Sequence, residues 1–127
     1  MYFNAETGEL GETFYCPVNG AAAVEKYGRT YSESTIKWWS EQSEEAKRVL
    51  TDPNAMDLKE ALLAFSLFAG DTGDTMVNPQ VWGNGADFDC VVLGNSYDAC
   101  GLKKPWSFRQ NRCLRTLKEE IKLLSTE

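Results

Sequence analysis

The sequence predicts an α/β domain in which a small, mixed sheet packs against helices, and two observations support this class. The first is a strand, a tight turn and a helix in succession over residues 79–100. The second is the helical spacing of apolar side chains near 32–50, 55–69 and 112–124. Because 127 residues is a usual length for one domain, the chain is expected to form a single domain over residues 1–127.

The N-terminal part of the sequence predicts short elements. Strands are expected near 1–4 and 12–18, separated by a turn at Glu6-Thr7-Gly8, as in a hairpin whose first strand is almost missing. Asn19 is suited to cap a short, alanine-rich helix that Gly28 would end.

A long helical region is expected at 32–50, and it contains two adjacent tryptophans. Neighbouring side chains on a helix point about 100° apart, so Trp38 and Trp39 cannot share one narrow face. One is expected to pack and the other to be at least partly open. Two interpretations stay open: both rings cover an edge of the core, or one stacks on a planar ligand such as a base.

The next helix, at 55–69, is expected to belong to the core. Leu58, Leu62 and Phe65 recur in it at spacings of four and three residues. Residues 71–78 are expected to form a polar, solvated loop, since their acidic residues do not follow the EF-hand pattern.

The strand, turn and helix in the middle of the chain form the most informative stretch. A short strand is expected at 79–83, and Asn84-Gly85 is a turn pair that tolerates positive φ. Asp87 is suited to cap a helix near 87–100, and Gly101 would close that helix.

Asp89 falls in the first turn of this helix, and Phe88 and Val92 would share one helical face. A carboxylate in this position lies at the carboxyl end of a strand, where open α/β sheets usually bind ligands. In the alternative interpretation, Asp87 and Asp89 only cap the helix and favour its dipole.

Residues 112–124 predict an amphipathic helix with a basic strip. Residues 103–127 carry 7 basic and 3 acidic side chains, whereas residues 1–102 carry 6 basic and 16 acidic ones. The acidic body argues against broad coating by nucleic acid, while a local basic strip can hold a phosphate backbone. The strip consists of Arg109, Arg112, Arg115, Lys118 and Lys122.

The composition excludes several classes of site. The chain contains no histidine, which excludes Ser-His-Asp and Cys-His nucleophile systems and any histidine general base. Its four cysteines include no C-x-x-C pair, so a zinc site is not expected. No signal peptide and no membrane span are recognised, so the expected location is cytoplasmic, with free thiols.

Four stretches, in this order, resemble one family: Glu6 to Gly11, Thr35 to Ser43, Val81 to Asp89, and Asn111 to Leu117. Together they are similar to the 3′-5′ exoribonuclease-like domains of phages and bacteria, within the ribonuclease T and DnaQ-like exonucleases of the DEDD superfamily. The resemblance covers nearly the whole chain and implies a ribonuclease H-like fold. Its most specific parts are the Trp-Trp pair and the Trp-Gly-Asn-Gly-x-x-Phe-Asp stretch.

The resemblance also implies a chemistry. In that family four acidic residues hold two Mg²⁺ or Mn²⁺ ions, and a histidine acts as base on a water. Carried over by position, Asp89 matches the acid of the middle motif and is the expected catalytic residue and metal ligand. The residues that the resemblance assigns to substrate binding are Asn84, Gly85, Phe88, Trp39 and Arg115.

Two family motifs have no counterpart in the sequence. They are the Asp-x-Glu of the first strand and the His and Asp of the last helix, so the chain is expected to be truncated at both ends, with an incomplete sheet, and inactive alone. An open sheet edge would favour a homo-oligomer or a partner that covers it.

The alternative function is a non-catalytic module of phage or mobile-element origin that binds single-stranded nucleic acid weakly or binds another protein. A third class is a small acidic protein that binds a basic partner.

Overall fold

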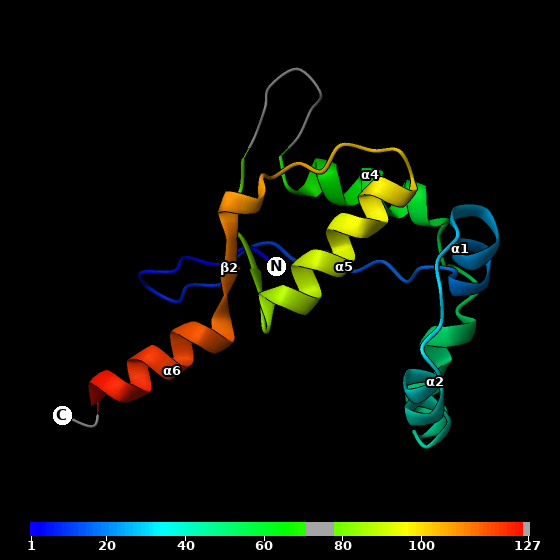
Figure 1. The fold of residues 1–127 in the computed structure, drawn as a ribbon, viewed down its shortest axis with the longest axis horizontal. Helices are drawn as coiled ribbons and strands as arrows, with labels where there is room; N and C mark the ends of the chain where they lie inside the picture. Colours follow the sequence, from blue (N-terminus) through cyan, green and yellow to red (C-terminus); the bar gives the residue numbers. More distant parts are fainter. Residues whose placement is uncertain (71–77, 126–127) are drawn as a thin grey trace. The chain divides into compact units, whose positions relative to one another are not determined.

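The computed structural model describes residues 1–70 and 78–125, and the chain divides into two compact units, Met1–Phe68 and Ala69–Glu127. It has a mixed α/β structure, with helices in both units and a two-stranded parallel sheet in the second (Figure 1). Of the expected polar loop, residues 71–77 lie outside the described part of the chain. Within the described part, no helix is both long and apolar enough to cross a membrane. That residues 1–127 form one domain stays a prediction.

In the first unit, helix α1 (Gly20–Tyr27) packs against helix α4 (Leu58–Phe68). The Asn19 side chain accepts a hydrogen bond from the Ala22 N–H at 3.0 Å, and Gly28 follows the helix in the left-handed region. The predicted start and end of α1 are therefore confirmed. The buried side chains of the two helices are Ala23, Leu58, Ala61, Leu62 and Ser66.

The N-terminal segment forms a hairpin without regular strands. Phe3 and Leu10 make one isolated antiparallel bridge, and Val18 makes a parallel bridge with the segment before α4. The strands predicted at 1–4 and 12–18 are therefore wrong, because each pairing is too short to build a ladder.

Aromatic rings hold this hairpin against α4. Tyr2 and Phe68 lie with their ring centroids 4.9 Å apart, and the Tyr2 hydroxyl donates a hydrogen bond to the Phe68 carbonyl oxygen at 2.6 Å. The ring of Phe14 lies 5.8 Å from that of Phe65 and 5.4 Å from that of Phe68. Aromatic pairs at such distances add roughly 0.5–1.5 kcal/mol each beyond the area they bury. Side-chain packing thus fixes a segment that has few backbone pairings.

The single helix predicted at 32–50 is wrong. The structure contains α2 (Glu33–Ser40), α3 (Glu44–Lys47) and a 3₁₀ turn, η1 (Arg48–Thr51), and none of the three includes a buried side chain. Polar side chains at the break bond the backbone locally and compete with the helical ladder. Ser40 donates to the Lys37 carbonyl, Gln42 donates to the Trp38 carbonyl, and Ser43 accepts from the Ala46 N–H.

The two adjacent tryptophans differ in exposure, as predicted. Trp38 is 53% exposed, whereas Trp39 is half-buried. Their rings meet edge to face, with centroids 5.0 Å apart and planes at 83°. Each ring therefore shields part of the other.

The second unit contains β1 (Val81–Gly83), α5 (Ala86–Ala99), a 3₁₀ turn η2 (Phe108–Gln110), β2 (Asn111–Cys113) and α6 (Leu114–Ser125). The two strands are parallel, so β1, α5 and β2 form a βαβ arrangement (Figure 1). In the register of the sheet, Val81 lies opposite Asn111 and Gly83 lies opposite Cys113.

Strand β2 corrects the helix predicted at 112–124, which begins later, at Leu114. The tripeptide Asn111-Arg112-Cys113 contains none of the β-branched or aromatic residues that favour strands. Pairing with β1 gives it an extended conformation, which is a tertiary effect.

The boundaries of α5 agree with the prediction within one residue, but its first cap does not. Gly85, rather than Asp87, occupies the N-cap position. At the other end, Gly101 has φ +67°, and the Leu102 N–H donates to the Tyr97 carbonyl oxygen at 3.0 Å. This bond is typical of a helix closed by glycine, so the predicted end is confirmed.

The buried face of α5 consists mainly of small residues. Cys90 and Gly94 are buried, whereas Phe88 is 72% exposed and Val92 is 41% exposed. Phe88 and Val92 therefore lie on the open side of the helix. Small side chains let α5 approach the strands closely.

Tyr97 anchors the end of α5. It is 1% exposed, and its ring meets that of Trp106 edge to face at 5.9 Å. The Trp106 indole N–H donates to the Asn111 Oδ1 at 2.7 Å. This chain of contacts ties the end of the helix to the first residue of β2.

Replacing Tyr97 by alanine is expected to lower the free energy of unfolding by about 3–5 kcal/mol, because a large cavity would remain beside Trp106. The matched control, Phe88→Ala, removes a ring from the exposed side of the same helix and should change it by less than about 0.5 kcal/mol. Urea denaturation followed by tryptophan fluorescence measures both values. Equal losses in the two variants would contradict the assigned faces of α5.

Candidate functional site

The carboxyl ends of β1 and β2 lie at the same edge of the sheet, because the strands are parallel. Helix α5 begins at Ala86, just after β1, and α6 begins at Leu114, directly after β2. The N–H groups of the first turn of a helix have no partner within the helix, and they carry a partial positive charge. We call this region the helix-start junction. It consists of Gly83, Asn84, Gly85, Ala86, Asp89, Cys113, Arg115 and Thr116.

Asp89 is exposed in the first turn of α5, and its side chain lies against Gly83. A Cβ atom placed on Gly83 would lie 3.0 Å from the Cβ of Asp89 and 3.2 Å from its Oδ2. A residue with a side chain at position 83 would therefore force the helix and the strand apart. The expected position of Asp89, in the first helical turn after a strand, is confirmed, and its catalytic and metal-binding role stays a prediction.

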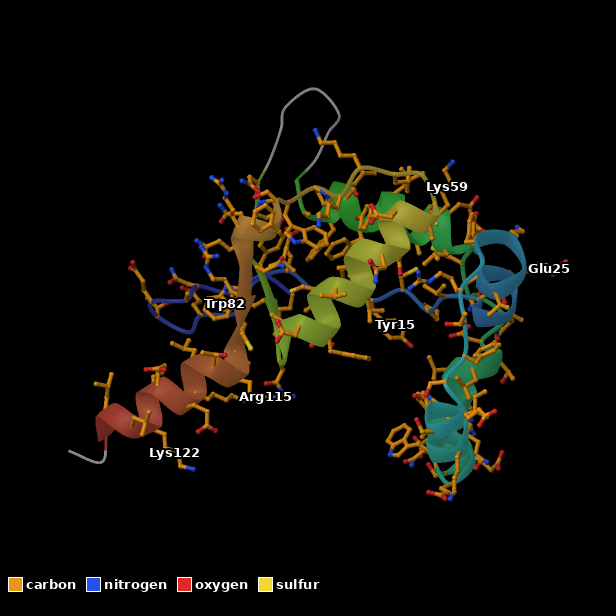
Figure 2. The ribbon with its side chains drawn as sticks, viewed as in Figure 1. Tyr15, Glu25, Lys59, Trp82, Arg115 and Lys122 are labelled. Carbon is orange, nitrogen blue, oxygen red and sulfur yellow. The ribbon has the colours of Figure 1, made fainter. Side chains whose placement is uncertain are left out.

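Arg115, in the first turn of α6, reaches the turn that follows β1 (Figure 2). Its Nη2 donates a hydrogen bond to the Asn84 carbonyl oxygen at 3.1 Å. Gly85 has φ +105°, and a Cβ atom placed on it would lie 3.1–3.3 Å from the guanidinium. Glycine is favoured there because of the positive φ, and a side chain at position 85 would also displace the Arg115 guanidinium. The structure thus brings together Asn84, Gly85 and Arg115, which the resemblance assigns to substrate binding.

Cys113 lies at the centre of the junction. The Ala86 N–H donates a hydrogen bond to its Sγ at 3.5 Å. The Thr116 hydroxyl is the largest influence on this thiol, and together with the backbone N–H groups of Ala86, Thr116 and Gly85 it lowers the pKa of Cys113 to about 6. Two helix starts therefore stabilise one thiolate.

Cys90 has the opposite environment. It lies one helical turn after Ala86, is 4% exposed, and its thiol donates to the Val81 carbonyl oxygen at 3.8 Å. Burial raises the pKa of Cys90, the negative charges of Asp89 and Cys113 raise it further, and Lys104 opposes them. At neutral pH Cys90 is a protonated thiol.

The described residues do not fit the two-ion site that the resemblance implies. Residues 1–70 and 78–125 contain no group of three or more Asp, Glu, His or Cys side chains that could hold an ion. Asp87 and Asp89 lie two positions apart on α5, which turns their side chains about 200° from each other. The chain also contains no histidine to act as a base. In this part of the chain the junction supplies one carboxylate, Asp89.

The other two residues assigned to substrate binding are Phe88 and Trp39. Phe88 precedes Asp89 on α5 with its ring open to solvent. Trp39 belongs to the first unit, where it lies on α2 against Trp38. Sequence reasoning did not assign Cys113 and Thr116 to the site, although both lie in the Asn111 to Leu117 stretch that carries the resemblance. Their environment arises where two helix starts converge, which this stretch alone does not reveal.

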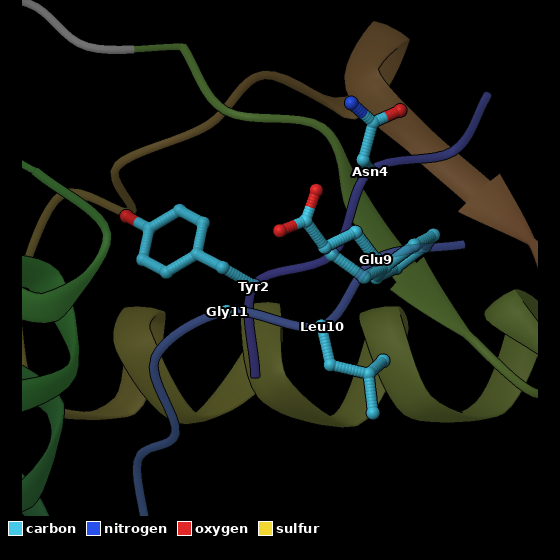
Figure 3. A pocket seen from close by; sticks show the side chains of 6 residues that line it. Tyr2, Asn4, Glu9, Leu10 and Gly11 are labelled. Carbon is cyan, nitrogen blue, oxygen red and sulfur yellow. The ribbon is translucent and has the colours of Figure 1, made fainter. Parts of the chain in front are cut away.

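The first unit contains a shallow, open pocket on the N-terminal hairpin. It is lined by Tyr2, Phe3, Asn4, Glu9, Leu10 and Gly11 (Figure 3). Glu9 is its one carboxylate, and the Tyr2 hydroxyl is already bonded to a backbone carbonyl. The pocket therefore offers less chemistry than the helix-start junction.

Comparison with known families identifies the chain. A family model described as the 3′-5′ exoribonuclease Rv2179c-like domain matches residues 1–126. The chain belongs to this family. Comparison with curated proteins and with solved structures gave no significant match. Membership confirms the resemblance to 3′-5′ exoribonuclease-like domains, and the helix-start junction is the candidate site of this Rv2179c-like domain.

In the Rv2179c-like domain, alkylation of Cys113 by iodoacetamide is expected to reach half its maximal rate near pH 6. The thiolate is the nucleophile, and its fraction rises with pH through the pKa of about 6. At pH 6 about half of Cys113 is ionised, against less than about 1% of an ordinary thiol of pKa about 8.5. A thiolate of low pKa is also a weaker nucleophile, which reduces the effect of this larger thiolate fraction roughly tenfold. At pH 6 Cys113 is therefore expected to react about tenfold faster than an ordinary thiol.

Cys16 is the matched control, because it has the same intermediate exposure and its thiol donates to a backbone carbonyl oxygen, that of Pro17. Quantitative mass spectrometry of the two alkylated peptides gives both rates between pH 5 and pH 9. Thr116→Val should move the midpoint of the Cys113 alkylation rate to higher pH, since it removes the hydroxyl that donates to the Cys113 sulfur. Identical midpoints for Cys113 and Cys16 would contradict the assigned environment.

Proposed function

We propose that the helix-start junction receives the 3′ end of a single-stranded RNA or DNA, and that Asp89 and Arg115 face it. The observation that carries this proposal is the placement of one carboxylate and one guanidinium at the carboxyl ends of two parallel strands. Ligands of open α/β sheets bind at this edge. Membership of a family described as 3′-5′ exoribonuclease-like supports the choice of ligand.

Arg115 is the proposed phosphate contact, because a planar guanidinium matches the geometry of phosphate oxygens. The other basic side chains of α6, Lys118 and Lys122, follow Arg115 at spacings of three and four residues and extend the positive strip along the helix. Figure 2 labels Arg115 near the start of this helix and Lys122 further along it. Phe88 presents an open ring on which a base can stack. That Trp39, which belongs to the first unit, stacks on a base stays a prediction.

Asp89 is proposed as one ligand of Mg²⁺ or Mn²⁺, within a DEDD-type exonuclease that has a ribonuclease H-like fold. Carboxylate oxygens are the hard ligands that these ions prefer, and the ions would activate water and stabilise the leaving group. A single carboxylate does not hold two ions, and no histidine is present to serve as base. The chain alone is therefore proposed to be catalytically incomplete, in a cytoplasmic setting where its thiols stay reduced.

The chain alone is expected to release no nucleotides from single-stranded RNA or DNA above background in Mg²⁺ or Mn²⁺. The physical reason is that residues 1–70 and 78–125 contain no group of three or more side chains able to hold an ion, at Asp89 or elsewhere. End-labelled oligonucleotides resolved on a denaturing gel measure the reaction. Asp89→Asn tests the proposed ligand, and Asp87→Asn is the matched control, since it removes an equally exposed carboxylate from the same turn.

Two outcomes of this assay would overturn parts of the proposal. Cleavage that Asp89→Asn abolishes and Asp87→Asn retains would show that the chain is complete or that a second copy completes its site. Cleavage that both variants retain would show that Asp89 has no role in it.

A non-catalytic binding module is the second candidate function, and the incomplete set of carboxylates favours it. Such a module would bind single-stranded nucleic acid weakly through α6, or would bind another protein. In the described part of the chain the sheet has only two strands, so its edges are open to a strand from a second copy or from a partner. Self-association is therefore proposed as well.

Arg115→Ala is expected to weaken binding of a single-stranded oligonucleotide about 3- to 10-fold at low salt, because it removes one phosphate contact. It should also reduce the slope of log affinity against log salt by about 0.7. Arg48→Ala removes the same charge from the first unit, and it should leave both the affinity at low salt and the salt slope nearly unchanged. Fluorescence anisotropy over a salt series measures them, and equal effects of the two variants would exclude Arg115 as a specific contact.

A further inference from the structure

Cys113 of the helix-start junction and Cys90, which follows the junction on α5, lie in the same layer, between α5 and the sheet. Cys113 lies opposite Gly83 in the parallel register, so its side chain leaves the sheet on the side where Gly83 meets α5. The bond from the Ala86 N–H to the Cys113 Sγ places this sulfur at the start of α5. Cys90 follows Ala86 by one helical turn on the same face, and it bonds the β1 carbonyl of Val81. Both thiols are free in the structure.

We propose that Cys113 and Cys90 form an oxidant-responsive thiol pair that converts into a disulfide joining β2 to α5. Cys113 is the half-buried member that a small oxidant reaches first, and Cys90 is the buried member that resolves the product. This inference concerns the chemistry of the two sulfurs and does not depend on the proposed nuclease site.

Cys113 has the features of a reactive thiol. Reactive cysteines lie in electropositive, partly exposed surroundings, and helix N-termini are among the groups that create them. Here the first turns of α5 and α6 both direct N–H groups at one sulfur. The other half-buried thiol, Cys16, bonds a backbone carbonyl and the Met56 sulfur instead.

The chemistry balances with hydrogen peroxide as the oxidant. The Cys113 thiolate attacks one peroxide oxygen, the O–O bond breaks, and Cys113 becomes a sulfenic acid while hydroxide leaves. The Cys90 sulfur then attacks the Cys113 sulfur, and the sulfenic oxygen leaves as water with the thiol proton. The two sulfurs together lose two electrons, and one peroxide becomes two waters.

Disulfide formation requires the two sulfurs to approach to about 2 Å. The bond from the Ala86 N–H places the Cys113 sulfur at the start of α5, one helical turn before Cys90. The approach of the two sulfurs therefore requires a local rearrangement of the start of α5 and the end of β2.

The test treats the reduced full-length chain with hydrogen peroxide at pH 7, blocks the remaining thiols and maps the peptides by mass spectrometry. The expected product is an intramolecular Cys90–Cys113 peptide, with a mass lower by two hydrogens, that dithiothreitol reverses. Cys90→Ser should abolish this product and leave a Cys113 sulfenic acid that dimedone traps. Cys16→Ser, the matched control, should leave the linked peptide unchanged.

Three results would overturn the proposal. They are a wild-type chain in which dimedone traps Cys113 and no linked peptide forms, a disulfide that joins Cys113 of two copies, and oxidation of Cys16 at the same rate as Cys113. Because the first and the third are read in the wild-type chain, they do not depend on whether a variant folds.

Discussion

The close approach of α5 to the two parallel strands determines most features of the second unit. At one end, the missing side chain of Gly83 leaves room for Ala86 and Asp89. At the other end, the buried ring of Tyr97 meets Trp106, which is bonded to the first residue of β2. A helix held at both ends cannot slide along the strands. Its first N–H groups are therefore fixed at the carboxyl ends of β1 and β2, where the charged and nucleophilic side chains gather.

Local chemistry made part of the fold predictable. Asn19, Gly28 and Gly101 act through bonds to the nearest turn of their own helix, so the sequence alone identifies them. The strand β2 and the break after α2 could not be found in this way. Strand β2 depends on pairing with a segment about thirty residues away. The break after α2 depends on a competition between backbone hydrogen bonds of the helix and side-chain hydrogen bonds of similar strength.

The same distinction applies to the candidate site. Asn84, Gly85 and Asp89 belong to one continuous turn and helix start, so a motif can reveal them together. Arg115 was found through the resemblance, and the structure supplies its bond to the Asn84 carbonyl. Cys113 stands in the Asn111 to Leu117 stretch of the resemblance, but its lowered pKa arises from donors on both α5 and α6, which the stretch alone does not reveal. Properties that depend on two converging elements become visible only when the elements are placed.

The helix-start junction is also electrostatically divided. Helix α5 carries Asp87, Asp89 and Asp98 and no basic residue, whereas the first five residues of α6, from Leu114 to Lys118, carry Arg115 and Lys118 and no acidic residue; Glu119 and Glu120 follow them. A phosphodiester that contacts Arg115 therefore meets the negative charge of Asp89 across the turn after β1. Like charges a few ångströms apart repel appreciably even near the surface, where the effective dielectric constant is about 20. If the proposed function holds, a cation beside Asp89 would remove this repulsion, so a divalent ion and a nucleic-acid end would bind better together than either one alone.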